Sequence, residues 1–176
     1  MPHYTTTANR MNAPLILTVL LDETAQQFFN EKRKEHFPLE RNFLEAHLTL
    51  FHHLPNEAIV INTVQAVCAH QQMIALHVRE VVIIGKGVAY KMESPQLITL
   101  HKKLQHTWRV LLTPQDAQGL WPHVTVQNKV TAEVAKNTKQ QLQETFVPFT
   151  AYANGLILWK YLNGPWELYQ QFLFAG

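Results

Sequence analysis

The alternation of hydrophobic and polar blocks predicts that the chain begins with a strand followed by a helix. The apolar segment from Ala13 to Leu21 predicts a buried strand, because it is short and a helix start follows it at once. Asp22 is the expected N-cap of that helix. Ala25, Phe28 and Phe29 have the i, i+3, i+4 spacing of a helix face that packs against a core.

The middle of the chain predicts a helix with one strand segment before it and two after it. Glu45 to Leu54 predicts a strand, and helical spacing then runs from Val60 to about Gln72. Strict alternation from Met73 to Arg79 predicts a half-buried strand. Val81 to Met92 is rich in β-forming residues, but Gly85-Lys86-Gly87 interrupts it and indicates a bulge or a tight bend.

The remaining segments predict two helices and three strands. Ser94 and Pro95 start a helix that continues to Thr113-Pro114, and Thr131 caps a later one. The predicted strands are Trp121 to Val130, Gly155 to Tyr161 and Trp166 to Phe174, of which the last two form a hairpin through Asn163-Gly164.

The same order of elements occurs twice, because strand, helix, strand and helix follow one another in each half. We therefore predict an α/β (α+β) fold of two pseudo-symmetric lobes, each a mainly antiparallel sheet packed by helices, around a central cleft. Since no linker separates the halves, residues 13–176 form a single bilobal domain. Residues 1–12 precede any periodic pattern and are expected to be flexible.

Two short motifs occupy matching positions in the halves. They are His47-Leu48-Thr49 and His123-Val124-Thr125. Residues two apart on a strand point to the same face, so each histidine emerges beside its threonine while the apolar residues turn toward the helices. This pattern is typical of strands that line a wet cleft on one face.

The pair of motifs indicates phosphodiester chemistry. Cleavage needs a base for the attacking oxygen and an acid for the leaving oxygen, and two imidazoles that titrate near neutrality supply both. The hydroxyls of Thr49 and Thr125 bind phosphate oxygens, and the scheme needs no metal or other cofactor. For hydrolysis we expect His123 to activate water and His47 to protonate the leaving oxygen, with both limbs of the pH profile near neutrality. On spacing alone, incidental strand histidines remain an alternative.

The sequence also resembles a known family. HLTL at 47–50 and PHVTV at 122–126 are similar to the duplicated HxTx motifs of the two-histidine phosphoesterase superfamily, often labelled 2′,5′ RNA ligase-like. The resemblance extends from Ala13 to Phe174 and includes the order of elements. It implies that His47 and His123 are the catalytic pair. It also implies a substrate such as a 2′,3′-cyclic phosphate, 2′,5′-linked or 3′-terminal RNA, or a small cyclic nucleotide.

Two positions depart from the family pattern. Many members carry an aromatic residue five positions after the first histidine, where this chain has His52. Many carry an arginine five positions after the second histidine, where this chain has Asn128 followed by Lys129. The resemblance therefore does not assign the phosphate-binding cation, for which Lys129 is the candidate.

Strand alternation and aromatic character add six candidate substrate-binding residues. The alternation places some of them on the cleft face beside the motifs, and aromatic rings there can stack on a base. For the aromatic residues, packing in the core or at the rim is the competing interpretation. The set is Phe51, His53, Tyr90, Trp121, Gln127 and Lys129. Arg33 and Lys34 are instead expected on a solvated helix face.

Composition and charge exclude several classes. The single cysteine, Cys68, excludes an intramolecular disulfide and a multi-cysteine metal site. His47, His52 and His53 raise a zinc hypothesis, but adjacent strand residues face opposite ways, so we expect no metal. The net charge of +2 lacks the basic clustering typical of proteins that coat duplex DNA. No apolar run reaches membrane-spanning length, and a cytoplasmic monomer with a nucleotide or RNA-end substrate is expected.

Two alternatives from other classes remain open. The first is a non-catalytic RNA- or nucleotide-binding module of the same fold. The second is a metal-dependent hydrolase.

Overall fold

The structure is a computed structural model that describes residues 10–176. Most of the predicted flexible N-terminus, residues 1–12, therefore lies outside the described part. In chain order the elements are β1 (Leu15–Leu21), α2 (Glu23–His36), the short 3-10 helix η1 (Leu39–Arg41), β2 (Thr49–Leu54), α3 (Ala58–Cys68), β3 (Ile74–Ile84), β4 (Gly87–Glu93), α4 (Pro95–Trp108), β5 (His123–Gln127), α5 (Ala132–Thr145), β6 (Phe149–Tyr161) and β7 (Trp166–Leu173).

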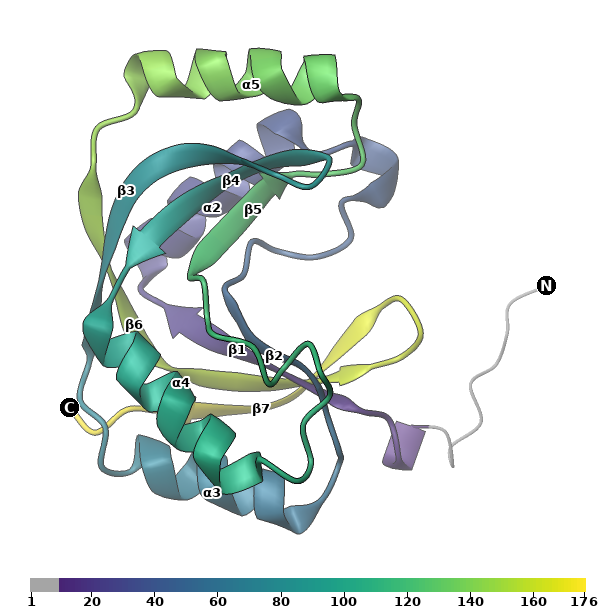
Figure 1. Cartoon of the computed structure of the whole chain (residues 1–176), viewed down its shortest axis with the longest axis vertical. Helices are drawn as coiled ribbons and strands as arrows, with labels where there is room; N and C mark the ends of the chain where they lie inside the picture. Colours follow the sequence, from purple (N-terminus) through teal and green to yellow (C-terminus); the bar gives the residue numbers. More distant parts are fainter. Residues whose placement is uncertain (1–9) are drawn as a thin grey trace.

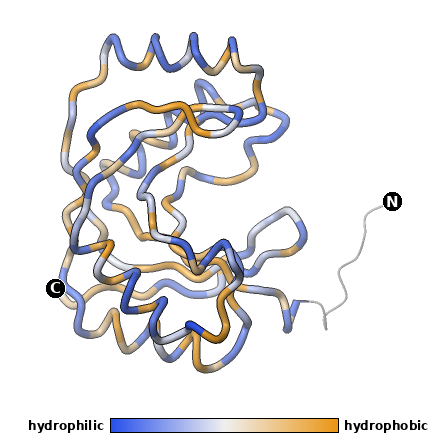
Figure 2. Tube along the Cα trace, in the orientation of Figure 1, coloured by the Kyte–Doolittle hydropathy of each residue, from blue (hydrophilic) through white to orange (hydrophobic). Residues whose placement is uncertain are grey.

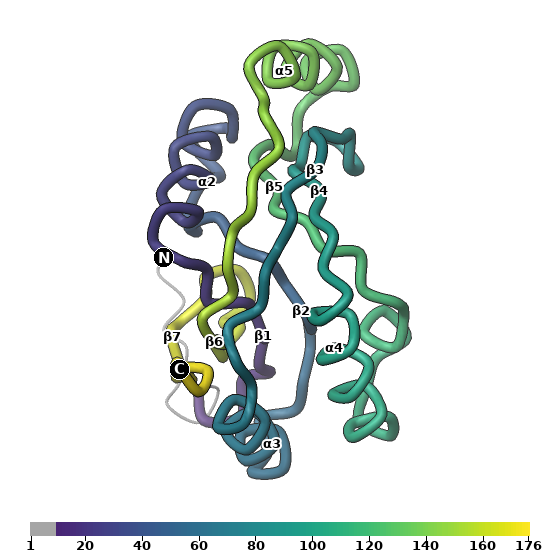
Figure 3. The backbone as a smooth tube through the Cα atoms, turned by 90° about the vertical axis from the view of Figure 1, so that its left-hand side faces the viewer, coloured from purple at the N-terminus to yellow at the C-terminus, as the bar shows by residue number. Residues whose placement is uncertain are grey.

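The strands form one seven-stranded sheet in the order β2-β1-β6-β3-β4-β5, with β7 also paired to β6. Every pair in it is antiparallel, so the predicted antiparallel α+β fold is confirmed. The two lobes share this sheet instead of having one each. The long strands β6 and β3 run side by side from one lobe to the other and join them (Figure 3).

Figure 1 shows the sheet as a strongly curved layer. Strands β1, β2 and β7 lie in its lower arm with α3 and α4 beneath them, and β4 and β5 lie in its upper arm below α5. The strand order places β2 and β5 at the two ends of the sheet. The two motif strands therefore lie at opposite ends of this order, and the curvature allows them to face each other.

The helices are exchanged between the two halves of the sequence. In α2, Arg33 donates to the carbonyl of Thr125 on β5 at 3.2 Å. In α4, the Nε2 of His101 donates to the carbonyl of Leu50 on β2 at 3.1 Å, and its ring stacks on Phe51 at 4.6 Å. Each helix thus packs against the motif strand of the other half, and neither half forms its lobe alone.

The core follows the predicted faces of strands and helices. Figure 2 shows hydrophobic segments along the central strands, while α5 is mostly hydrophilic. An aromatic cluster joins α2 to the upper arm, with ring centroids of Phe28 and Phe29 at 5.4 and 5.6 Å from that of Tyr90. Burial of such rings stabilises the fold by several kcal/mol in total, on the order of 2 kcal/mol each. No helix in residues 10–176 is both long and apolar enough to cross a membrane.

The first motif strand is shorter than predicted, because β2 begins at Thr49 instead of Glu45. Side chains of α2 take the backbone groups just before it: Asn30 accepts from the N–H of Ala46, and Gln26 donates to the Ala46 carbonyl, both at 2.8 Å. These amides compete with the sheet ladder and draw the segment toward the helix. His47 consequently precedes the strand.

The predicted interruption at residues 85–87 is the turn of a β-hairpin. Gly85 has a φ of +50°, which a glycine adopts without steric cost. Gly87 pairs with Ile84 across the turn. A Cβ at Gly87 would overlap the backbone carbonyl of Gln127 on β5, so the absence of a side chain is what allows β5 to approach.

Both predicted helix starts at Asp22 and Ser94 are confirmed, because their side chains accept from backbone N–H groups three residues later. The helix after Ser94 ends earlier than predicted, at Trp108. The segment 109–122 that follows crosses from α4 to β5 and contributes to the site described below.

Candidate functional site

The two motif histidines are held by the same hydrogen bond. Nδ1 of His47 bonds to the carbonyl oxygen of Glu45 at 2.7 Å, and Nδ1 of His123 bonds to that of Trp121 at 2.7 Å. A carbonyl oxygen can only accept, so Nδ1 carries the proton in both rings. Each neutral ring therefore presents an Nε2 lone pair that has no hydrogen-bond partner within residues 10–176.

An indole flanks each motif imidazole. The Trp166 ring of β7 lies 4.6 Å from the His47 ring, and the Trp121 ring lies 4.9 Å from the His123 ring. Trp121 is 42% exposed. Its position beside His123 agrees with the rim interpretation, and its contact with a substrate stays a prediction.

Burial lowers the proton affinity of both motif rings. Desolvation is the main cause that lowers the pKa of His47 to about 4; the hydrogen bond to Glu45 opposes it, and the charges of Arg33, His123 and His52 add to it. Desolvation also lowers the pKa of His123, against the bond to Trp121. The charge of His123 is among the causes that lower the pKa of His47, so the two rings lie within electrostatic range of each other.

The motif threonines are half-buried at the sheet edges. Thr49 is the first residue of β2 and pairs with Thr18 of β1, while Thr125 lies in β5 opposite Ala89. Neither hydroxyl is hydrogen-bonded within the described chain. Each has the donor and acceptor capacity that a phosphate oxygen requires, and their contact with phosphate stays a prediction.

The sequence indicated that Arg33 lies on a solvated helix face. In the structure Arg33 is instead buried, with 6% of it exposed. Its Nε donates to the Asn42 side chain at 2.8 Å and to the Leu44 carbonyl at 2.9 Å, and its Nη1 donates to Thr125. No carboxylate in residues 10–176 forms an ion pair with it. Desolvation lowers the pKa of Arg33 to about 10, which leaves it charged near neutral pH beside His47.

Three predicted substrate-binding residues lie in the core. Phe51 is fully buried and packs against His101 and Trp108, and Tyr90 is 1% exposed within the aromatic cluster. Gln127 is 3% exposed, and its Nε2 donates to the hydroxyl of Thr138 in α5 at 2.8 Å. Buried side chains with these partners cannot contact a substrate, so Phe51, Tyr90 and Gln127 lie outside the candidate site.

Lys129 also departs from its predicted position. Strand β5 ends at Gln127, and Lys129 has a φ of 60° in the loop beyond it. The neighbouring Val130 bonds to the carbonyl of Lys86 in the β3–β4 turn. The exposed Lys129 side chain therefore belongs to the far end of β5 and does not continue the face of His123 and Thr125.

A bulge in β2 reverses the predicted roles of His52 and His53. Leu17 pairs with Phe51 whereas Leu15 pairs with Leu54, so β2 has one extra residue at this point. The alternation that predicted a cleft position for His53 fails there. The charge of His52, and not that of His53, lowers the pKa of both motif histidines.

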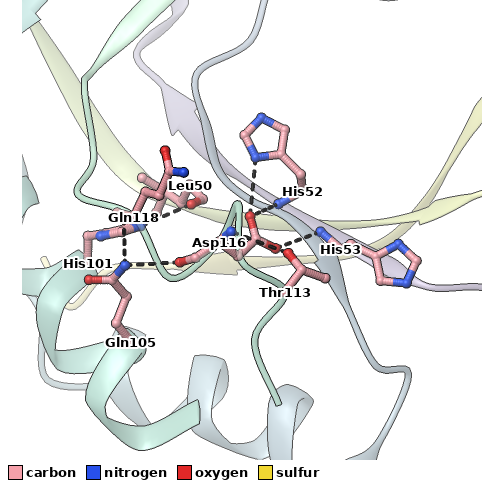
Figure 4. Close-up of polar contacts among 8 residues, drawn as sticks. All are labelled: Leu50, His52, His53, His101, Gln105, Thr113, Asp116 and Gln118. Carbon is pink, nitrogen blue, oxygen red and sulfur yellow. Dashed lines mark hydrogen bonds and ion pairs between the residues drawn. The ribbon is translucent and has the colours of Figure 1, made fainter. Parts of the chain in front are cut away.

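Sequence reasoning also missed Asp116, which holds this bulge (Figure 4). Its carboxylate accepts from the backbone N–H groups of His52 and His53 at 2.8 Å each and from Nδ1 of His52 at 3.2 Å. Burial opposes ionisation of Asp116, but these bonds together outweigh it and lower its pKa. The sequence did contain a signal for His52, which lies five residues after His47 at a position where the chain departs from the family pattern. It contained no signal for Asp116.

A cavity of about 820 Å³ opens beside His47 between α2 and the β6–β7 hairpin. Phe43, Trp159 and Trp166 are among its lining residues, while His123 is not. A volume of this size accommodates a small ligand. Within residues 10–176, no three or more His, Cys, Asp or Glu side chains are grouped so that they would hold a metal ion.

The chain matches the family model of the 2′-5′ RNA ligase superfamily over residues 21–165. No functionally curated protein matches it. Among solved structures, E. coli LigT complexed with 3′-AMP has 16% sequence identity and a TM-score of 0.59, and the match covers 94% of this chain and 99% of LigT. The protein TT0787 of Thermus thermophilus has 15% identity and a TM-score of 0.65, with 93% and 98% covered.

A third crystal structure, of a protein named phosphoesterase, has 16% identity and a TM-score of 0.62 and covers 94% of this chain and 99% of its own. At such identities the structural matches show a shared fold. The family match covers most of the sequence, including both His-x-Thr motifs. This chain therefore belongs to the 2′-5′ RNA ligase superfamily.

Proposed function

We propose that the chain is a metal-independent phosphodiesterase that acts on a nucleotide or an RNA end, at a 2′,3′-cyclic or 2′,5′-linked phosphodiester. The observation that supports this most directly is the matched pair of imidazoles, His47 and His123, each with Nδ1 bonded to a carbonyl and Nε2 unbonded. Two such nitrogens in one site supply a general base and a general acid.

The solved relatives support a nucleotide ligand. LigT has been crystallised with 3′-AMP and with phosphate. In this chain, the cavity beside His47 provides room for a nucleoside, and the rings of Trp166 and Phe43 in its lining suit a base.

In the proposed hydrolysis, Nε2 of His47 accepts a proton from water as the water oxygen bonds to phosphorus. The bond from phosphorus to the leaving ribose oxygen breaks, and that oxygen takes the proton from Nε2 of His123. A phosphomonoester and a free hydroxyl result, and solvent returns the rings to their starting protonation. The hydroxyls of Thr49 and Thr125 bind the non-bridging oxygens, where negative charge gathers.

These roles reverse the expectation from the sequence. Burial lowers the pKa of both rings, and at His47, where the pKa falls to about 4, the charge of Arg33 lowers it further. When the pair binds a single proton, that proton therefore resides mainly on His123. The neutral His47 is then the base and the charged His123 is the acid.

Leaving groups of different basicity test the roles. A p-nitrophenyl leaving group departs without a proton, so His123→Ala should lose about 100-fold or more in kcat on a ribose-leaving substrate and much less on the aryl diester. His47→Ala should lose similar factors on both substrates. The opposite pattern would restore His123 as the base.

Assays of the wild type test the function itself. If neither a 2′,3′-cyclic nor a 2′,5′-linked nucleotide is cleaved by the wild type, the chain is a nucleotide-binding module without turnover. Activity that disappears with a chelator and returns with zinc would instead establish a metal-dependent hydrolase.

A further inference from the structure

The bulge in β2 creates a paired donor site that Asp116 fills. In a bulge, successive N–H groups point to the same side instead of alternating. The N–H groups of His52 and His53 accordingly donate to the two oxygens of one carboxylate, His52 to Oδ1 and His53 to Oδ2. The free edge of β2, on the side away from β1, thus obtains a partner from the segment 109–122.

Asp116 is fixed in this position from several directions. Its side chain is 1% exposed. Its own N–H donates to the hydroxyl of Thr113 at 3.3 Å, and its carbonyl accepts from Nε2 of Gln105 in α4 at 2.9 Å. A carboxylate held in this way can in turn orient any side chain that bonds to it.

That side chain is His52. Nδ1 of His52 lies 3.2 Å from Oδ1 of Asp116, and an ionised carboxylate can only accept, so Nδ1 donates. Figure 4 shows the rings of His52 and His53 pointing in different directions from the bulge. The His52 side chain is 52% exposed, and its Nε2 has no hydrogen-bond partner within residues 10–176.

Three imidazoles therefore share one arrangement, in which an oxygen holds Nδ1 and Nε2 is unbonded. The partners of His47 and His123 are neutral carbonyls, whereas the partner of His52 is a carboxylate. A carboxylate partner suits a ring that carries a positive charge during function. The charge of His52 also acts on both other rings, so His52 lies within electrostatic range of each.

Apart from Lys34 of α2, which lines the cavity beside His47, the site has few cationic donors for the phosphate. In the proposed reaction, His47 and His123 are occupied with water and with the leaving oxygen. Arg33 supplies positive charge, but its Nε and Nη1 already donate to protein oxygens. Lys129 lies in the loop beyond the far end of β5.

We propose that His52, oriented by Asp116, is a substrate-contacting residue whose Nε2–H donates to a non-bridging oxygen of the bound phosphate. The imidazolium then lies between two anions, the carboxylate and the phosphate. This inference rests on the proposed function, and it assigns to His52 the phosphate-binding role that the family pattern left open in this chain. Asp116 is a positioning residue that acts through His52.

Binding of inorganic phosphate, measured by calorimetry at pH 6, tests the role of His52 without turnover. His52→Gln should raise the Kd about tenfold or more, as expected for the loss of a charge-assisted hydrogen bond. His53→Gln is the matched control on the same bulge, and it should change the Kd less than about twofold. Equal effects of the two substitutions overturn the proposal, as does a wild type that binds no phosphate at millimolar concentration.

A double-mutant cycle tests whether Asp116 acts through His52. Asp116→Asn should weaken phosphate binding in the wild-type background and have no further effect in the His52→Gln background. If Asp116→Asn does not fold, Thr113→Val removes only the hydroxyl that holds Asp116 and should give the same pattern at a smaller size. Additive effects in both backgrounds overturn the positioning role.

Kinetics separate this inference from the proposed function. With a cleavable cyclic nucleotide, His52→Gln should raise KM more than it lowers kcat. If no substrate is cleaved while phosphate binding still depends on His52, the proposed function fails and the inference stands. If turnover depends on His47 and His123 while phosphate binding ignores His52, only the inference fails.

Discussion

At the scale of single residues, the site is defined by how imidazole rings are held and how far they are removed from water. Backbone carbonyls hold Nδ1 of His47 and His123, and burial keeps both rings neutral in the ligand-free protein near pH 7. The sequence predicted these two residues and their chemistry. It did not predict the depth of their burial, because that depends on α2, β7 and the segment 109–122 packing around them.

The pH dependence of kcat/KM should reflect this burial. In the proposed mechanism the active free protein has one proton on the pair, and the pKa of both rings is lowered from 6.5. As pH rises above about 6.5, the singly protonated form is lost and kcat/KM should fall about tenfold per pH unit. The optimum of kcat/KM should thus lie on the acid side of neutrality. The sequence alone had suggested an optimum near neutral pH.

The dependence of kcat should be displaced in the opposite direction. A bound phosphate carries negative charge that raises the pKa of both rings, so the kcat optimum should lie at higher pH than that of kcat/KM. Measurement of both parameters from pH 4 to 9 checks this. A kcat/KM that stays constant or increases between pH 5 and 8 would contradict the proposed protonation states.

Stability should also depend on the protonation of His47. Its pKa is about 4 in the folded chain and 6.5 in the reference state, so the unfolded chain binds the proton first as pH falls. The stability that the neutral ring permits is fully present above pH 6.5 and is lost progressively down to about pH 4. Urea unfolding at several pH values should therefore show a weaker pH dependence for His47→Gln than for the wild type. As a control, His106→Gln at an exposed position of α4 should leave the pH dependence of the unfolding free energy as in the wild type.

At the scale of elements, the motif strands at the two ends of the sheet carry residues of the proposed chemistry, and local irregularities orient their side chains. Strand alternation correctly separated Leu48 and Val124 from the motif residues, and both are fully buried. It failed at Phe51 and His53, because β2 has two register shifts against β1, one between Thr49 and Phe51 and one between Phe51 and Leu54, and each changes the side to which residues point. A bulge is determined by the partner strand and by Asp116, which is distant in sequence, so alternation alone does not indicate it.

The close approach of β4 and β5 gives a test at this scale. Gly87→Ala should destabilise the chain by about 2 kcal/mol or more, because the new Cβ overlaps the carbonyl of Gln127 and must displace β5. Activity should fall with it, since β5 carries His123. Gly119→Ala is the control, with nothing within 4 Å of the added Cβ. Equal unfolding free energies for the two variants would show that β5 can shift without cost.

At the scale of the whole molecule, a helix from each half of the sequence packs on the motif strand of the other. Arg33 illustrates the consequence, since it joins α2 to the segment 42–44 and to β5 while its charge acts on His47. The fold therefore couples the assembly of the lobes to the electrostatics of the site. The sequence pattern suggested a solvated arginine here. It did not indicate the burial, because all three acceptors of Arg33 lie outside α2.

Replacement of Arg33 should alter stability and site together. Arg33→Gln removes a cation that lowers the pKa of His47, so NMR titration should give a higher pKa than in the wild type. The free energy of unfolding should decrease by about 2 kcal/mol, because the buried oxygens that accept from Arg33 lose their donor. The neighbouring Lys34→Gln, on an exposed position of α2, should change neither quantity. A His47 pKa that remains near 4 in Arg33→Gln would contradict the coupling.

By itself, the sequence determined the elements, their antiparallel α+β class and the two His-x-Thr motifs, because periodicity, helix caps and short motifs are local properties. Tertiary structure decided which histidines lie within electrostatic range of one another, that burial lowers the pKa of His47 and His123, and that Phe51, Tyr90 and Gln127 belong to the core. It also brought Asp116 to the bulge of β2 and Arg33 to β5. These features depend on contacts between residues far apart in the chain, and no local pattern encodes the distance between such residues.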